Sequence, residues 1–295
     1  MRTSIAVLGV GRIGSALVER LVAAGHDVLA TDIDPDRRAT VEAAGARWSP
    51  DIAAAEIVFT ALPGIPELTD LVLGSGQLLS RMDSVAVWVD LTSASFEAAQ
   101  DFALAAAKQG IARLDAPIGG GVPAMRAGTV RLYVGGDEAI LARVGPVLRA
   151  FAETIHHVGG PGSGYLTKLL INLLWFGTAS LTTEALLLGQ RNGIAPDRLR
   201  EVLLGSAGDS AFARQHLPAL LAGDYLADFG LDRCVEELNS VEQSAQRGGT
   251  PHPITTAVAE LHRSALTRYG QVNGELMASA LLEEQAGSHL RDGVG

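Results

Sequence analysis

Two polar side chains with catalytic potential, Lys168 and Asn172, stand four residues apart in the apolar stretch GPGSGYLTKLLIN. On a helix, residues i and i+4 project from one face, so both can touch one small molecule. A lysine on a partly desolvated face can, as the ammonium, protonate a carbonyl that receives hydride, or, as the neutral amine, deprotonate a carbinol that loses it. A lone lysine is more often a solvated surface charge, but the apolar surround and the asparagine favour chemistry. We therefore predict Lys168 as general acid/base and Asn172 as the group that orients the reacting atom.

A glycine pattern near the start of the chain is typical of dinucleotide binding. Gly9, Gly11 and Gly14 form GxGxxG between an apolar strand pattern, SIAVLGV, and a helical pattern. The first glycine permits a tight turn, the second lets backbone approach a pyrophosphate, and the third lets helix and strand pack closely. The helix then begins at Arg12 and Ile13, with its backbone amides aimed at the phosphates.

The acidic residue expected of such a unit is Asp32, which ends the second strand candidate, DVLATD. A carboxylate at this point accepts both ribose hydroxyls and repels a 2′-phosphate, so NAD is the expected cofactor. Arg37 and Arg38 follow closely, and NADP remains possible if they pair a phosphate. The plainer explanation for both arginines is a solvated surface.

The elements that position these residues fall into two halves. Short β-branched runs alternate with helical stretches as far as GGPGSG, which predicts a parallel sheet with helices on both faces. Beyond it the apolar spacing is helical, and one helix of about 28 residues, about 42 Å long, is expected through Lys168 and Asn172. We predict an α/β fold with a doubly wound Rossmann domain over residues 1–161. An all-α substrate and oligomerisation domain over residues 162–295 follows, joined by the long helix.

Composition narrows the class of partner. The chain has 33 acidic and 23 basic side chains and a formal net charge of -10, which argues against nucleic acid and against anionic membranes. The uncharged run 169–183 is shorter than the roughly 20 apolar residues of a membrane span, so a buried helix is expected there. Cys234 is the only cysteine, which excludes an internal disulfide and favours a cytoplasmic location. The seven histidines form no HExxH motif, and no metal site is expected.

The long apolar helix would leave apolar surface exposed in a monomer. We therefore expect a homodimer or a higher homo-oligomer that acts on a small-molecule substrate.

Three further segments carry a family resemblance. TALPG contains Leu62 and Pro63, VDLTS contains Thr92 and Ser93, and DAPIGGGVPAMRAGTVRLYVGG spans residues 115–136. In this order, and followed by GPGSGYLTKLLIN, they resemble the β-hydroxyacid dehydrogenase family. That family includes 3-hydroxyisobutyrate dehydrogenases, tartronate semialdehyde reductases and the related imine reductases. The resemblance implies that the first two segments contact the cofactor, that the third binds substrate, and that Lys168 is catalytic.

Two departures from the family pattern bear on the substrate. The family usually has a serine that helps to hold the substrate carboxylate where this chain has Gly119, although the amides of Gly119, Gly120 and Gly121 can form an anion-binding nest. In FGLDRCVEELN, residues 229–239, the family's Lys-Asp pair is replaced by Glu236 at the cofactor and Glu237 at the substrate.

The loss of a cation and the gain of an anion favour a neutral or cationic substrate. Trp175 and Phe176, beyond Lys168 on the same helix, could line an apolar pocket or simply belong to the core. The leading hypothesis is an NAD-dependent dehydrogenase of a small hydroxyacid or semialdehyde. An imine or ketone reductase whose substrate lacks a carboxylate is the first alternative, and a dinucleotide-binding protein without turnover is the second.

Overall fold

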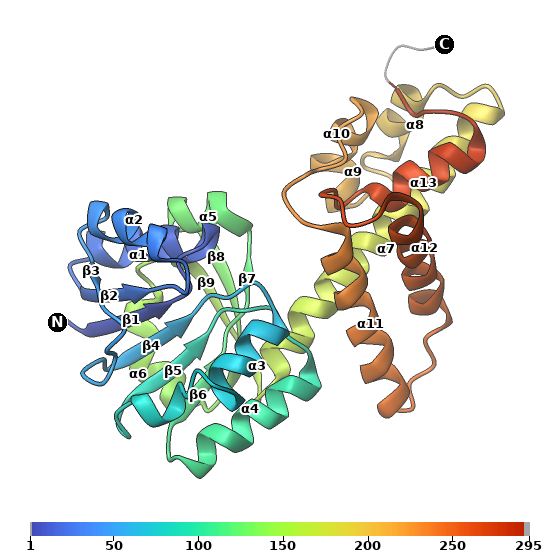
Figure 1. Ribbon diagram of the computed structural model, residues 1–295. Coiled ribbons are helices and arrows are strands. Elements are labelled where there is room, and N and C mark those ends of the chain that lie inside the picture. Colours follow the sequence, from blue (N-terminus) through green and yellow to red (C-terminus); the bar gives the residue numbers. More distant parts are fainter. Residues whose placement is uncertain (1, 292–295) are drawn as a thin grey trace. The chain divides into compact units, whose positions relative to one another are not determined.

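The β-branched runs of the first half form the parallel sheet that the sequence predicts (Figure 1). The computed structural model describes residues 2–291, and these divide into two compact units between Lys168 and Leu169. Within the described residues the strand order is β3-β2-β1-β4-β5-β6-β8-β7, with β9 paired to β8. The strands are β1 (Ser4–Leu8), β2 (Asp27–Thr31), β3 (Arg47–Trp48), β4 (Ile57–Thr60), β5 (Val87–Asp90), β6 (Ala112–Asp115), β7 (Ile118–Gly119), β8 (Val130–Gly136) and β9 (Ala152–Gly159).

The order of the first six strands is that of a doubly wound dinucleotide-binding sheet. Strands β3, β2, β1, β4, β5 and β6 are all parallel, and the chain reverses its direction of travel across the sheet between β1 and β4. In such sheets ligands bind beyond the carboxyl ends of the strands at this reversal. Strand β8 is antiparallel to both β6 and β7. The Rossmann prediction for the first half is confirmed.

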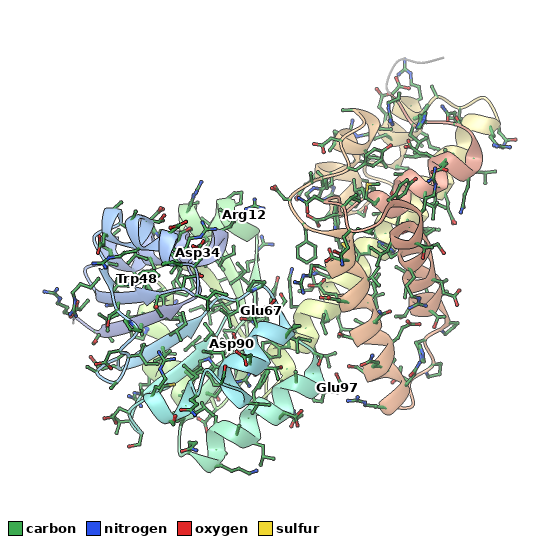
Figure 2. All side chains as sticks on the ribbon, in the orientation of Figure 1. Arg12, Asp34, Trp48, Glu67, Asp90 and Glu97 are labelled. Atoms are coloured by element: carbon green, nitrogen blue, oxygen red, sulfur yellow. The ribbon has the colours of Figure 1, made fainter. Side chains whose placement is uncertain are left out.

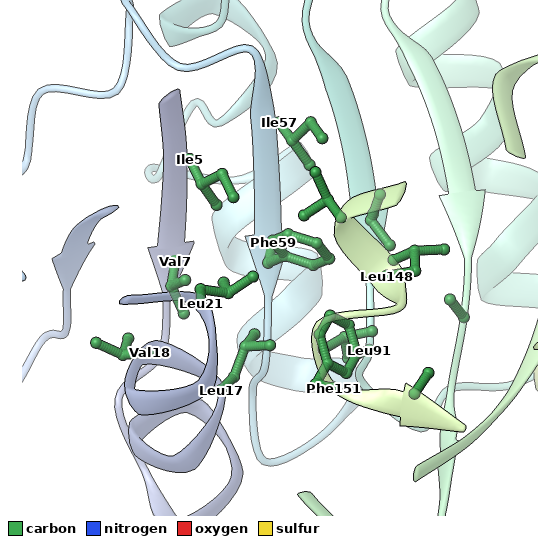
Figure 3. Close-up of a cluster of buried hydrophobic side chains, with 14 of the residues drawn as sticks. Ile5, Val7, Leu17, Val18, Leu21, Ile57, Phe59, Leu91, Leu148 and Phe151 are labelled. Carbon is green, nitrogen blue, oxygen red and sulfur yellow. The ribbon is translucent and has the colours of Figure 1, made fainter. Parts of the chain in front are cut away.

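Alternating side chains bury both faces of the sheet. On β1, Ile5 and Val7 join one cluster of buried apolar residues, while Ala6 and Leu8 join the cluster on the opposite face. The first cluster includes Phe59 and side chains of the covering helices (Figure 3). That face is covered by α1 (Arg12–Ala23), α2 (Arg38–Ala43), α5 (Gly121–Ala127) and α6 (Glu138–Leu148). The opposite face is covered by α3 (Ile65–Leu73) and α4 (Phe96–Lys108).

The long helix expected after the glycine-rich turn is α7 (Ser163–Arg191), a single helix of 29 residues. By length and apolar composition alone, it is the one helix in the described part of the chain that could cross a membrane, a test that core helices of soluble proteins also pass. Only 33% of its most apolar 18-residue window is buried. Leu174, Leu181 and Leu188 are 70%, 68% and 66% exposed, so the expectation of a buried helix holds for one face of α7 only.

The second unit is helical throughout its described elements, as predicted. Its helices pack around three apolar clusters, one of which contains Phe176 and Cys234. After α7 come α8 (Pro196–Leu203), α9 (Ala211–Gln215), α10 (Leu217–Leu221), α11 (Leu231–Arg247), α12 (Pro253–Tyr269) and α13 (Met277–Ala286).

Candidate functional site

The glycine turn after β1 has the geometry of a phosphate cradle. A Cβ at Gly9 would collide with the carbonyl oxygen of Ala61, and one at Gly14 would collide with the carbonyl oxygen of Gly9. A Cβ at Gly11 would meet no atom within 4 Å. Packing therefore requires the first and third glycines, while the second leaves open space in front of α1. Arg12 begins that helix, whose N-terminus has no side-chain cap (Figure 2).

Asp32 is held at the end of β2 beside this turn. Its Oδ2 accepts the Val10 N–H at 2.6 Å, and its Oδ1 accepts the Asp34 N–H at 3.0 Å. Two backbone amides thus fix the carboxylate in the place where a ribose would be bound. The glycine turn and Asp32 together fit an NAD cofactor.

The two arginines that kept NADP possible are engaged by acidic partners. Arg37 Nε lies 3.3 Å from Asp34 Oδ2, and Arg38 Nε lies 2.8 Å from Glu42 Oε1. Both pairs are exposed to solvent, where such contacts are worth less than about 1 kcal/mol. The pairing favours solvated surface arginines over a 2′-phosphate site.

The two loops with family resemblance, which follow β4 and β5, are tied to each other. The Leu62 N–H donates to Thr92 Oγ1 at 3.2 Å, and the Thr92 N–H donates to Asp90 Oδ1 at 3.0 Å. The Thr60 hydroxyl donates to the same Asp90 oxygen at 2.7 Å. Pro63 and Ser93 stand next to these bonded residues in the chain. Asp90 therefore anchors both predicted cofactor loops.

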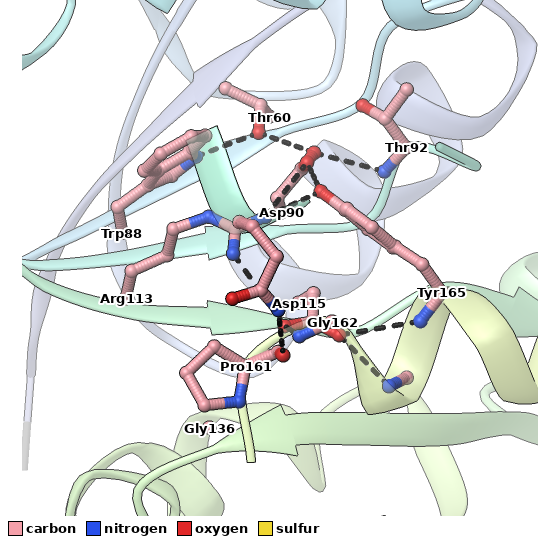
Figure 4. A network of polar contacts seen from close by, with 12 residues as sticks. Thr60, Trp88, Asp90, Thr92, Arg113, Asp115, Gly136, Pro161, Gly162 and Tyr165 are labelled. Carbon is pink, nitrogen blue, oxygen red and sulfur yellow. Dashed lines mark hydrogen bonds and ion pairs between the residues drawn. The ribbon is translucent and has the colours of Figure 1, made fainter. Parts of the chain in front are cut away.

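Sequence reasoning missed a buried polar network that continues from Asp90 (Figure 4). The Tyr165 hydroxyl donates to Asp90, and Arg113 Nη2 donates to the Tyr165 oxygen at 2.7 Å. The carboxylate of Asp115 accepts N–H groups from the first residues of α7 and its lead-in, at 2.7 Å from Gly162 and 2.9 Å from Gly164. The ends of β5 and β6 are thereby bonded to the start of the helix that carries Lys168.

Charge also holds this network together. Arg113 lies 3.9 Å from Asp90 and 3.6 Å from Asp115, and its guanidinium stacks 4.8 Å from the Trp88 ring centre. Burial raises the pKa of Asp90, and the Arg113 charge and three hydrogen bonds oppose that shift. Burial also raises the pKa of Tyr165 well above its ordinary value, so the phenol stays protonated and donates. The signal in the sequence was Arg113 itself, a charged residue inside the strand pattern IARLDAP.

Lys168 and Asn172 lie on α7 at the predicted spacing, and Glu237 of α11 contacts Asn172. Asn172 Nδ2 donates to Glu237 Oε2 at 2.6 Å. Glu237 is buried on α11, whereas its neighbour Glu236 is exposed and pairs with Arg233 at 2.8 Å. The structure brings Asn172 and Glu237 together and places Glu236 on the solvent side of α11.

The two aromatic residues beyond Lys168 have different surroundings. Trp175 Nε1 donates to Glu275 Oε2 at 3.1 Å, and its ring meets Phe212 and His216 edge to face. Trp175 is half-buried, whereas Phe176 is a core residue packed against His262. The core interpretation is therefore correct for Phe176, and a substrate contact of Trp175 stays a prediction.

The three glycines of the predicted substrate segment differ in backbone conformation. Gly120 and Gly121 have φ of 102° and 62°, values that favour glycine. Gly119, which ends β7, has no such φ, so a side chain is compatible with its backbone. A Cβ there would instead lie 3.0 Å from the Tyr133 hydroxyl oxygen. The glycine at 119 is explained by the neighbouring ring.

Comparisons with known proteins identify the family and the type of cofactor. Residues 4–159 match the family model for the NAD binding domain of 6-phosphogluconate dehydrogenase. Residues 162–282 match the model for the NAD-binding region of NADP-dependent 3-hydroxyisobutyrate dehydrogenase. A curated relative, 2-(hydroxymethyl)glutarate dehydrogenase of Eubacterium barkeri, is 31% identical over 262 residues, 87% of each chain.

Solved structures share the fold. The 3-hydroxyisobutyrate dehydrogenase of Mycobacterium tuberculosis, solved with L-serine, is 25% identical with a TM-score of 0.86, covering 95% of this chain and 99% of that one. An imine reductase variant from Myxococcus stipitatus, solved with NAD+, is 19% identical with a TM-score of 0.63, covering 96% and 100%. The second likeness concerns the fold alone.

Proposed function

The chain belongs to the β-hydroxyacid dehydrogenase family and is an NAD(P)-dependent oxidoreductase, and we propose that its substrate is a small hydroxyacid or the corresponding semialdehyde. The compounds named with its relatives, 2-(hydroxymethyl)glutarate, 3-hydroxyisobutyrate and L-serine, each carry a hydroxymethyl group on a carbon that also bears a carboxylate. We propose the same chemical class here. Residues 1–161 would bind the dinucleotide, and residues 162–295 would complete the substrate site and form the oligomer.

The observation that carries this proposal is the polar face of α7, where Lys168 lies one turn before Asn172 and Glu237 holds the Asn172 amide. NAD, when bound, supplies the hydride acceptor or donor at its nicotinamide ring. Lys168 takes the hydroxyl proton as hydride leaves the carbinol carbon, and returns it in the reverse direction. Asn172 orients the reacting oxygen, and Glu237 fixes Asn172 and faces the substrate.

The cofactor preference proposed is NAD. The carboxylate of Asp32 stands at the end of β2, and Arg37 and Arg38 are paired with Asp34 and Glu42 rather than clustered toward it. The proposed cofactor contacts besides Asp32 come from the turn, the two loops and α11. They are Gly9, Gly11, Arg12, Ile13, Gly14, Leu62, Pro63, Thr92, Ser93 and Glu236.

The test combines a substrate screen with one variant. Purified protein is assayed with NAD and NADP against hydroxyacids, alcohols, ketones and cyclic imines, read at the nicotinamide absorbance. Lys168→Ala should lower kcat by about 10²- to 10⁴-fold, the usual contribution of a general acid/base, and retain NAD binding. Turnover of hydroxyacids that survives Lys168→Ala unchanged would refute the assignment of the proton to Lys168.

Two alternatives remain distinguishable in the same screen. An imine or ketone reductase is favoured by the buried anion Glu237 beside Asn172, which suits a cationic iminium, and it would turn over imines or ketones in preference to hydroxyacids. A dinucleotide-binding protein without turnover would bind NADH and reduce nothing.

We also propose a homodimer in the cytoplasm. Ile171, Leu174, Leu181 and Leu188 are exposed on α7 at spacings of three and seven, which place them on one stripe of the helix. Burying this stripe against a second copy would remove it from water. Light scattering should give twice the 30.7 kDa chain mass, and Leu174→Glu combined with Leu181→Glu should lower it to one chain.

A further inference from the structure

Tyr133 lies over Gly119, in the part of the substrate segment where the family serine is absent. Strands β7 and β8 are antiparallel, and Gly119 pairs with Arg131. Tyr133 is two residues beyond Arg131 and therefore on the same face of the sheet, diagonally across from Gly119. The pairing is secured by the Tyr133 N–H, which donates to the Pro117 carbonyl at 3.3 Å.

The Tyr133 ring crowds the space that a side chain at position 119 would use. A Cβ at Gly119 would be 3.0 Å from the Tyr133 hydroxyl oxygen and 3.3 Å from its Cε2. The tyrosine hydroxyl thus stands beside the point from which a serine side chain would project.

The Tyr133 hydroxyl is positioned and available to a ligand. The ring stacks on His156 with centroids 6.0 Å apart and planes 10° apart, which holds its orientation. The side chain is half-buried, and its hydroxyl has no hydrogen-bond partner among residues 2–291. A donor held in place beside two left-handed glycines, Gly120 and Gly121, can serve a ligand from a preset position.

We propose that Tyr133 is a specificity-determining residue whose hydroxyl donates a hydrogen bond to the substrate carboxylate. It thereby replaces the serine hydroxyl that Gly119 lacks. The inference rests on the proposed function, since it concerns the carboxylate of a hydroxyacid. Loss of a hydrogen bond to a charged group lowers binding affinity about 10- to 100-fold. Because the carboxylate does not react, the loss falls on KM rather than kcat.

The test uses Tyr133→Phe with two probes, 3-hydroxyisobutyrate and isobutanol, which has a methyl group in place of the carboxylate. Tyr133→Phe should raise KM for the hydroxyacid about 10- to 100-fold, leave kcat within about twofold, and leave the isobutanol kinetics unchanged. Tyr269→Phe is the matched control, since it removes a phenol oxygen that bonds Glu284 at 2.9 Å, and KM should not change.

A double variant tests the replacement itself. Gly119→Ser with Tyr133→Phe restores a hydroxyl at position 119, where the nearest remaining ring carbon, Cε2, would be 3.3 Å from the new Cβ. A KM for the hydroxyacid that returns most of the way from the Tyr133→Phe value to the wild-type value supports the inference. If KM for the hydroxyacid is equal in wild type and in Tyr133→Phe, the inference is overturned, while the proposed hydroxyacid turnover is unaffected. The ring then serves only to cover Gly119.

Calorimetric titration of the protein with 3-hydroxyisobutyrate, with and without NAD, separates this inference from the proposed function. If 3-hydroxyisobutyrate binds more weakly to Tyr133→Phe than to wild type, but the wild type does not turn it over, the inference is retained and the proposed function is refuted. Absence of both binding and turnover in wild type refutes both.

Discussion

Replacing Asp115 with alanine should show how strongly the buried network holds the start of α7. The Asp115 side chain is fully buried, and its carboxylate accepts N–H groups from Gly162, Gly164 and Tyr165 at 2.7, 2.9 and 3.3 Å. It also lies 3.6 Å from Arg113, which is buried as well. The substitution therefore leaves three backbone donors without their acceptor and removes one of two counter-ions from a cation.

The expected cost is about 4 kcal/mol. Removing one partner of a buried ion pair costs about 3–5 kcal/mol, and each buried donor left unpaired costs about 1–3 kcal/mol. These costs do not add fully, because Asp90 still lies 3.9 Å from Arg113 and compensates part of its charge. At about 2–4 °C per kcal/mol for a domain of this size, the melting temperature of the first unit should fall by about 8–16 °C.

Asp137→Ala is the matched control. Asp137 is exposed and caps α6, where its Oδ1 accepts N–H groups from Ala139 at 2.7 Å and Ile140 at 3.2 Å. Loss of such a cap costs about 1 kcal/mol. Urea unfolding of both variants can be followed through tryptophan fluorescence, to which Trp88, buried against Arg113, contributes. Equal losses in the two variants, or a loss below about 2 kcal/mol for Asp115→Ala, would refute the view that buried charge dominates here.

Three further predictions concern the cofactor, pH and the thiol. Asp32→Ala should weaken NADH binding about tenfold and reduce the preference for NADH over NADPH. Both effects can be measured by nicotinamide fluorescence titration. An unchanged preference would count against Asp32 as the ribose ligand. Burial lowers the pKa of His262 below its ordinary 6.5, so the unfolded chain binds more protons, and stability should decline as pH falls below about 6.5. The urea midpoint should therefore drop between pH 7 and 5, less steeply in His262→Phe, and an equal slope in the two proteins would contradict this account. Burial, with Glu237 and Glu275 nearby, raises the pKa of Cys234, so a disulfide reagent should react only as fast as the second unit opens; rapid labelling of the folded protein would be the contrary result.

The parts that the sequence predicted correctly are those with local signals. The glycine turn, Asp32 and the strand alternation depend on neighbours within about 25 residues, and the long helix follows from the apolar spacing around Lys168 and Asn172. Local patterns do not show which distant residues meet. Tyr165 and Asp90 are 75 residues apart in the chain, so their bond could not be inferred from spacing.

Adjacent residues on helices presented the second difficulty. Glu236 and Glu237 differ by one position, which is enough to put one in solvent and the other against Asn172. Trp175 and Phe176 likewise divide between a half-buried polar contact and the core. The sequence indicated the segment in each case, but only the packing of α7 and α11 determines which member faces inward.

The crowding between position 119 and Tyr133 also constrains the order in which this segment could change during evolution. A Cβ at position 119 stands 3.0 Å from the phenol oxygen, so a serine there and a tyrosine at 133 strain each other. A lineage that carried the serine would accept an aromatic residue at 133 without a shift of the ring only after losing the serine side chain. In the reverse direction, the aromatic ring at position 133 would be lost before serine returned at position 119. Each residue therefore disfavours reversion of the other, so serine at 119 and tyrosine at 133 should seldom occur together.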